Sequence, residues 1–216
     1  EAARAVTKDL ESSSGGVHHA FRVDVSDRAM VARTAEEVRS SVGDVDVVVN
    51  NAGIVAGNRP LTETSEEEIE RTFAVNTLSL FWVTKAFLGD MVARNSGHVV
   101  TIASASGLLG VSRMVEYASS KHAAVGFDES LRMELAEVAP GVRTTVVNPF
   151  FIDTGMFEGV RSRVPFLLPI LAEAEVAKAV VVAVERNRSV VNLPRLVGLL
   201  APMRILPVKA FDAAIG

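Results

Sequence analysis

Cysteine is absent from this sequence, and tyrosine and tryptophan each occur only once among its 216 residues. Without cysteine the protein can form no disulfide, use no thiolate nucleophile and bind no metal through sulfur. Histidine is present, but no pair has the spacing of a helical zinc motif, so we expect no metal site. The four histidines are His18, His19, His98 and His122.

Long basic runs are also missing, and the net charge is −4, from 22 basic and 26 acidic residues. This balance argues against a nucleic acid as the partner. No uncharged apolar stretch reaches the roughly 20 residues that a membrane-spanning helix needs. The two most apolar regions, 164–172 and 190–211, are broken by prolines or cations. They are compatible with buried core, with the lining of an apolar substrate cavity, or with contact to a membrane surface.

What the sequence does contain is an alternation of short apolar runs and longer helical patterns. Strands that alternate with helices in this way predict an α/β fold, a doubly wound parallel sheet with helices on both faces. No linker or repeat divides it, so we expect one domain over 1–216. Ser26 is the predicted N-cap of a helix at 27–42, and Ser65 opens a capping box for a helix at 65–94. The predicted strands span 17–25, 45–50, 98–103, 142–149 and 189–194, and the predicted helices 27–42, 65–94, 115–138 and 173–187.

Small and polar residues collect where three of the predicted strands end. Asn-Asn-Ala-Gly occupies 50–53, Ser-Ala-Ser occupies 104–106, and Asn-Pro-Phe-Phe-Ile-Asp-Thr occupies 148–154. Each piece alone is typical of a turn. In open parallel sheets, however, ligands bind beyond the carboxyl ends of the strands. The three pieces together therefore predict a binding site at that edge of the sheet.

The only tyrosine, Tyr117, lies four residues before Lys121. On a helix the two side chains would share a face. An ammonium beside a phenol favours the phenolate and lowers its pKa from about 10, which would suit a proton donor and acceptor near neutral pH. Taken alone, the pair is more typical of an ordinary helix with a surface lysine, because residues i and i+4 are neighbours on every helix.

The catalytic pattern of the short-chain dehydrogenase/reductase family resembles these residues in order and spacing. In that family a serine lies thirteen positions before a Tyr-x-x-x-Lys pair, as Ser104 lies before Tyr117. The family also has a helix asparagine, which stands here as Asn76 in Phe-Ala-Val-Asn-Thr-Leu. The resemblance runs over nearly the whole chain, and it implies a Rossmann-like fold.

Three further motifs of the family are matched. Asn-Asn-Ala-Gly stands at 50–53, and the Asp-Val that follows the family's third strand stands at Asp24 and Val25. The Pro-Gly-x-x-x-Thr turn stands at 149–154, but Phe150 takes the place of the glycine, which puts the shape of that turn in question.

The resemblance implies hydride transfer between a nicotinamide cofactor and an alcohol or carbonyl. Tyr117 would exchange the proton with the substrate oxygen, and Lys121 would stabilise the phenolate and bind the nicotinamide ribose. Ser104 would orient the substrate oxygen. Asn76 would hold a water that relays protons from Lys121; from the residues alone it is more typical of a polar group that bends a helix.

The cofactor implied by the resemblance is NAD or NADP, with no preference readable from these residues. Asp24 and Val25 would contact the adenine ring. Asp24 could also cap the helix after it. Gly53 and its neighbours would let the backbone approach the cofactor. The implied cofactor contacts are Asp24, Val25, Asn51, Ala52, Gly53, Tyr117, Lys121, Pro149, Ile152 and Thr154.

Other segments resemble the retinol dehydrogenase and 17-beta-hydroxysteroid dehydrogenase-like branch, namely 81–88, 153–159 and 193–207. This branch implies an apolar substrate such as a retinoid or steroid, and the family implies a homodimer. It also implies an intracellular protein, held at the endoplasmic reticulum or a lipid droplet by a segment before residue 1. We expect 155–172 to form a lid over the substrate and 190–216 to form an apolar C-terminal segment. Candidate substrate contacts are Ser106, Met156 and Phe157.

The family's glycine-rich turn, Thr-Gly-x-x-x-Gly-x-Gly, is not found in the sequence. That turn lets the cofactor pyrophosphate lie on a helix N-terminus. Gly15-Gly16 does not replace it, because no predicted strand precedes it. We therefore expect an N-terminally incomplete domain that lacks its first βαβ unit, opens on a helix, and leaves 17–25 without its neighbouring strand. Two alternatives stay open: a catalytically dead remnant that binds a lipid or a protein, and a dehydrogenase for a small polar substrate.

Overall fold

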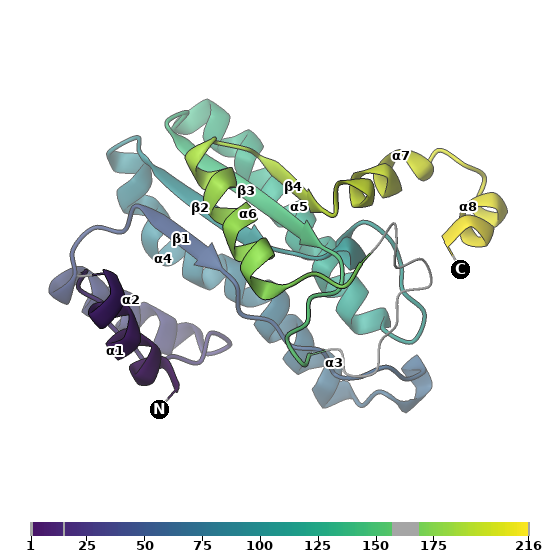
Figure 1. The fold of residues 1–216 in the computed structure, drawn as a ribbon, viewed down its shortest axis with the longest axis horizontal. Coiled ribbons are helices and arrows are strands. Elements are labelled where there is room, and N and C mark those ends of the chain that lie inside the picture. Colours follow the sequence, from purple (N-terminus) through teal and green to yellow (C-terminus); the bar gives the residue numbers. More distant parts are fainter. Residues whose placement is uncertain (1, 15, 157–168, 216) are drawn as a thin grey trace.

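The computed structural model describes residues 2–14, 16–156 and 169–215. At its centre, four parallel strands lie side by side in the order in which they occur along the chain (Figure 1). This arrangement confirms the predicted α/β class with a Rossmann-like parallel sheet. Four of the five predicted strands form. They are β1 (Val47–Asn50), β2 (Gly97–Ile102), β3 (Val142–Pro149) and β4 (Val190–Leu193).

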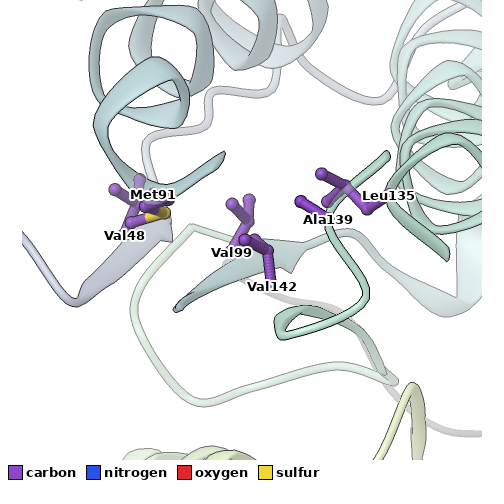
Figure 2. Packing of buried hydrophobic residues seen from close by; sticks show 6 residues of the cluster. All are labelled: Val48, Met91, Val99, Leu135, Ala139 and Val142. Atoms are coloured by element: carbon purple, nitrogen blue, oxygen red, sulfur yellow. The ribbon is translucent and has the colours of Figure 1, made fainter. Parts of the chain in front are cut away.

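Two helices, α4 (Ser79–Ala93) and α5 (Val115–Val138), cover one face of the sheet. Met91 from α4 and Leu135 from α5 pack there against Val99 of β2, and all three side chains are almost fully buried (Figure 2). Burial of a side chain of this size contributes about 1.5–3 kcal/mol relative to leaving it exposed. This layer fixes α5, and therefore Tyr117 and Lys121, against the strands.

The opposite face of the sheet is covered only in part. Successive strand residues point to opposite faces, so Val100 and Val147 lie on the face opposite to Val99. There they pack on α6 (Glu173–Glu185). In Figure 1 this helix lies across β3 and β4. Val47 and Val49 of β1 point to the same face, since Val49 is in register with Val100, yet they are 43% and 49% exposed.

The predicted helix over 65–94 forms in three pieces. Ser65 makes the predicted capping box, in which its hydroxyl accepts from the Glu68 N–H and the Glu68 carboxylate accepts from the Ser65 N–H. The pieces are α3 (Glu66–Phe73), the π-helical turn η2 (Ala74–Leu78) and α4. The helix before them, α2 (Arg28–Ser41), packs on α4, where the Arg39 guanidinium donates to the Ala86 carbonyl at 2.8 Å.

The predicted strand at 17–25 does not form, and this prediction is wrong. Residues 17–24 carry no assigned secondary structure, and Val17 is 82% exposed. A strand exists only through hydrogen bonds to a neighbouring strand, and in the part of the chain that the structure describes this stretch has none. The predicted N-cap is also wrong by one residue, because the Asp27 carboxylate, not Ser26, accepts from the N–H groups of Ala29 and Met30.

Short helical segments make up most of the rest. The opening helix expected from the sequence is confirmed as α1 (Ala2–Ser14). After β4 the chain leads away from the sheet (Figure 1). Within the described ranges, no helix has both the length and the apolar character needed to cross a membrane. The remaining segments are η1 (Leu61–Glu63), η3 (Ala105–Gly107), η4 (Arg195–Leu199), α7 (Leu200–Met203) and α8 (Val208–Ile215).

Candidate active site

Tyr117 and Lys121 lie one turn apart on α5, and both are buried. The Lys121 ammonium is 5.8 Å from the centre of the Tyr117 ring. It donates to the carbonyl of Ile102, the last residue of β2, at 3.0 Å. That bond uses one of its three protons and leaves two for other acceptors. The pair therefore sits at the carboxyl end of the sheet, as the sequence predicted.

Burial changes the acidity of both groups. Loss of hydration lowers the pKa of Lys121 to about 8. The same cause raises the pKa of Tyr117 above its ordinary value, while a hydrogen bond with the Ser104 side chain acts in the opposite direction. The expectation that the pKa of Tyr117 lies below its ordinary value is wrong, because desolvation of the phenol is the larger effect.

Ser104 reaches Tyr117 from the loop that follows β2. It caps η3, and its hydroxyl accepts from the Ser106 N–H at 3.1 Å. The η3 turn lies directly against α5: a Cβ added at Gly107 would be 2.6 Å from the Lys121 carbonyl oxygen. Since real Cβ atoms do not come that close to backbone, only glycine fits there. This close approach brings Ser104 next to Tyr117.

Asn76 joins three segments through one buried amide. Its Oδ1 accepts from the Ile54 N–H at 2.8 Å, and its Nδ2 donates to the Ile54 carbonyl at 2.9 Å and to the Ser120 hydroxyl at 3.0 Å. The Ser120 hydroxyl in turn donates to the Tyr117 carbonyl at 2.7 Å. Asn76 thus ties the loop after β1 to α5 from a π-helical turn, a feature common at functional sites.

Sequence reasoning named Asn76 but missed both of its partners. Ser120 is one of two adjacent serines between Tyr117 and Lys121, and nothing in the sequence distinguishes it from Ser119. Ile54 participates through its backbone, which carries no sequence signal.

Gly53 borders the same cluster. A Cβ added there would lie 3.5 Å from the Lys121 ammonium and 3.6 Å from the Asn76 Oδ1. Asn51 and Ala52 are exposed beside it. The Asn-Asn-Ala-Gly stretch therefore meets the catalytic candidates through Gly53 and presents two residues to solvent at the sheet edge. Asn50 turns inward instead and donates to the Thr84 hydroxyl at 2.9 Å.

The predicted adenine contacts lie apart from this network. Asp24 is exposed, and its carboxylate accepts from the N–H and the hydroxyl of Ser26. These hydrogen bonds hold the pKa of Asp24 below its ordinary value. Val25 is half-buried. Asp24 thus closes a local turn, and its contact with a cofactor stays a prediction.

The residues after β3 lie at the same edge as Ser104. Pro149 is buried at the end of the strand, and Ile152 forms a parallel bridge with Leu171. The Thr154 hydroxyl accepts from the Met156 N–H, and both residues are exposed. The bridge brings the two ends of the predicted lid at 155–172 together. Phe157 and most of that lid lie outside the described residues.

A buried acid that sequence reasoning missed lies further along α5. Asp128 is almost fully buried, and one carboxylate oxygen accepts from the Thr144 hydroxyl at 3.1 Å. Thr144, Thr101 and Arg132 all favour its charged form, but burial is the larger effect. Loss of hydration raises the pKa of Asp128 to about 6. Among the residues that the structure describes, no group of three or more His, Asp or Glu side chains could hold a metal ion.

Known proteins match this chain over most of its length. The family model for short chain dehydrogenases matches residues 1–165. Epidermal retinol dehydrogenase 2 of Mus musculus is 40% identical over 206 residues, which are 94% of this chain and 66% of the mouse protein. Retinol dehydrogenase 10 of Rattus norvegicus is 44% identical over 195 residues, which are 88% of this chain and 57% of the rat protein.

A solved structure agrees in fold. An alcohol dehydrogenase from the archaeon Thermococcus sibiricus, complexed with 5-hydroxy-NADP, superposes with a TM-score of 0.75 at 27% identity. The match covers 88% of this chain and 78% of the archaeal one. The chain spans less than two thirds of the length of the mouse and rat relatives. With its motifs in family order, a parallel sheet and a family match over 1–165, the chain belongs to the short-chain dehydrogenase family.

Proposed function

We propose that this protein is an oxidoreductase that transfers a hydride between NAD or NADP and an alcohol or carbonyl compound. The observation that carries the proposal is the buried cluster of Asn76, Ser104, Tyr117 and Lys121 at the carboxyl edge of the sheet. Hydrogen bonds connect Ser104 to Tyr117 and, through Ser120, Asn76 to Tyr117, while Lys121 bonds to the end of β2. A remnant without catalysis would have no need to keep these four polar groups out of water, because each costs free energy to bury. The cluster therefore favours an enzyme over a dead binding module.

Each of the four residues has a distinct task in the proposed reaction. The Tyr117 hydroxyl gives its proton to a carbonyl oxygen, or the Tyr117 phenolate takes the proton of an alcohol, while Ser104 holds the same oxygen by a hydrogen bond. Lys121 is largely protonated at pH 7, since its pKa is about 8, and its charge stabilises the phenolate. Asn76 fixes the helix that carries Tyr117 through Ser120.

The residues present fit the nicotinamide half of the cofactor. Gly53 leaves open the space beside Lys121, and the Lys121 ammonium has two protons free for ribose hydroxyls after its bond to Ile102. Pro149 ends β3, and Ile152 and Thr154 follow it at the same edge, where the nicotinamide would lie. When bound, the cofactor would accept or supply the hydride. The proposal covers NAD and NADP alike.

For the substrate we propose a large apolar alcohol or aldehyde, with retinol and retinal as the first choice. Two relatives at 40% and 44% identity are retinol dehydrogenases by name. The sequence between Thr154 and Glu173 is rich in apolar residues; of those that the structure describes, Met156 and Ile170 are exposed, whereas Leu171 is buried. A small polyol would leave its hydroxyls unpaired against such side chains, whereas a retinoid would bury apolar surface at about 25 cal/mol per Å².

A substrate panel tests this proposal. The purified protein is assayed with NAD(H) and NADP(H) against retinol, retinal, steroid alcohols, glycerol and sugars. We expect retinoids or steroids to give the highest kcat/KM. Preference for the small polar compounds would reject the apolar substrate and leave the reaction class standing. Lack of turnover with every compound, in a folded protein, would reject the enzyme.

A membrane or lipid-droplet surface is a further proposed partner. Ile205 and Val208, in the C-terminal segment, are 88% and 74% exposed. Between Glu185 and Asp212 the sequence has five cations and no acidic residue, in a chain whose net charge is negative. Apolar and cationic side chains together suit an anionic lipid surface. Sedimentation with anionic and neutral vesicles tests this, and failure to sediment with either rejects it.

A homodimer is proposed on the family resemblance. Sedimentation equilibrium at micromolar protein tests it, and a monomer over the whole concentration range would remove it.

A further inference from the structure

Arg204 connects the C-terminal segment to both halves of the candidate active site. It lies just after α7, and its guanidinium reaches two acceptors that are far away in the sequence. Its Nε donates to the Leu108 carbonyl at 2.9 Å, and a terminal nitrogen lies 2.7 Å from the His122 Nε2. Leu108 ends the η3 turn that begins after Ser104, and His122 follows Lys121 on α5.

The hydrogen-bond chemistry fixes the state of His122. The His122 Nδ1 is 2.8 Å from the Ala118 carbonyl, which can only accept, so Nδ1 carries the proton. The Arg204 guanidinium can only donate, so the His122 Nε2 is the acceptor. The contact therefore suits the tautomer of His122 that carries its proton on Nδ1. One guanidinium thereby bridges the Ser104 segment and the helix of Tyr117 and Lys121.

We propose that Arg204 is a positioning residue for the reaction, holding the Ser104 segment against α5 so that Ser104 and Tyr117 face the same substrate oxygen. This inference rests on the proposed function. Arg204 touches Leu108 and His122 rather than the reacting groups, so it acts through them. The planar guanidinium suits this task because it donates in two fixed directions at once. A lysine keeps the charge but cannot reproduce that geometry.

The Arg204 side chain is exposed, so its contacts can position the active site without adding much to the stability of the fold. An exposed Leu108 carbonyl released from Arg204 can bond to water instead, so the loss of the contact should barely change the stability of the fold. What it changes is the freedom of the loop between Ser104 and α5. Small displacements of aligned groups reduce turnover strongly.

The test compares Arg204→Lys and Arg204→Gln with a matched control, Arg195→Gln, which removes an exposed arginine from the same C-terminal segment. We expect both Arg204 variants to lower kcat about tenfold, equivalent to about 1.4 kcal/mol in the barrier, with KM within about twofold. The control should retain the parent values. The melting temperature should be unchanged in all three.

A second readout uses the single tyrosine of the chain. Ultraviolet titration of the tyrosinate band reports Tyr117 alone, over the pH range in which circular dichroism shows a folded protein. The hydrogen bond with Ser104 lowers the pKa of Tyr117, so the loss of alignment in Arg204→Lys should raise it. Because lysine keeps the charge, a shift in this variant reports geometry. The control should leave the titration unchanged.

The proposal stands if both kcat and the Tyr117 titration move in the Arg204 variants. It is overturned if kcat stays within twofold, if the loss of activity follows the unfolded fraction, or if the titration does not move. If the parent protein turns over no substrate, the proposed function fails, and the titration alone then tests the bridge. An unchanged pKa of Tyr117 in the Arg204 variants overturns the bridge. An upward shift of that pKa retains Arg204 as a positioning contact.

Discussion

The candidate active site and the β1 side of the sheet show how differently the same kinds of residues behave. Around the site, valines such as Val99 and Val147 are fully buried, and polar groups such as Asn76 have every partner they need. On β1, Val47 and Val49 are almost half exposed. The sequence nearby, at 17–25, has similar β-forming residues and forms no strand. The difference lies in the neighbours, because β propensity is realised only by packing and pairing.

The largest effect that we expect comes from removing the Tyr117 hydroxyl. Tyr117→Phe keeps the ring packed against Lys121 but leaves no group to exchange a proton, which should lower kcat by about 10²- to 10⁴-fold. Cofactor affinity should be nearly unchanged, since the hydroxyl is all that is lost. Steady-state kinetics and calorimetric titration of the cofactor measure both. Activity within tenfold of the parent would remove Tyr117 from its role.

Removing the Asn76 amide should damage the fold itself. Asn76→Ala leaves the N–H and carbonyl of Ile54 without partners, and each unsatisfied buried group costs about 1–3 kcal/mol, so we expect a loss of about 4 kcal/mol in the free energy of unfolding. The matched control is Asn51→Ala, which removes an exposed asparagine and should cost less than about 0.5 kcal/mol. Urea unfolding measures both, and equal losses would contradict the contrast.

Asp128 is a buried carboxyl whose charged form is disfavoured by burial, so it should make the free energy of unfolding depend on pH. Its folded pKa of about 6 lies above the ordinary value of 3.8, so its contribution to stability is complete below about pH 4 and is lost as pH rises through 6. The shift of about two units corresponds to about 3 kcal/mol at pH 8. Asp128→Asn, which cannot ionise, should therefore gain stability relative to the parent at pH 8, and about a third of that gain should remain at pH 4.5.

Thermal or urea unfolding at the two pH values checks this, and Glu129→Gln, next to Asp128 on the exposed side of α5, serves as the control. If Asp128→Asn gained no stability at pH 8, Thr144, Thr101 and Arg132 would have to offset the loss of hydration of the buried carboxylate.

The smallest effects contrast two adjacent residues on one strand. Val48 is 6% exposed and packs with Val99, whereas Val49 is 49% exposed. Val48→Ala should lower the free energy of unfolding by about 2 kcal/mol, as expected for a truncated core side chain. Val49→Ala should change it by less than about 0.5 kcal/mol. A large loss for Val49→Ala would mean that the open face of β1 is covered in solution.

The elements that the sequence predicted well are those whose neighbours also lie within it. Helix α5 and strand β3 span the predicted residues 115–138 and 142–149, because strong periodicity and flanking Pro140-Gly141 agree with the packing on both sides. The strand at 17–25 was predicted from its β-forming residues although its neighbouring strand was expected to be missing, and without a partner these residues form no strand. The π-helical turn within 65–94 was not predicted, because it depends on contacts that are distant in the sequence. The extra residue in this turn is favoured by the hydrogen bonds of Asn76 to Ile54 and Ser120.

Prediction of the site likewise succeeded for residues that neighbouring elements place and failed for contacts between distant parts of the chain. Motif spacing was sufficient to bring Ser104, Tyr117 and Lys121 together, because all three are placed by one strand and one helix. The bridge from Arg204 to His122 spans 82 residues, and that from Arg204 to Leu108 spans 96. Neither has a motif, and both depend on where the C-terminal segment turns after β4. The pKa of Tyr117 was misjudged because sequence reveals charged neighbours but not burial.

The π-helical turn at Ala74–Leu78 acts as a rotational adjustment between two helices. In a regular α-helix each residue advances the side chains by about 100° around the axis. Shortening this turn by one residue would restore an α-helix and rotate α3 by that angle relative to α4. Asn76 could then no longer direct its amide at both Ile54 and Ser120 while Met91 stays packed in the core. Except at Asn76, this turn is therefore expected to tolerate substitutions far better than a single deletion.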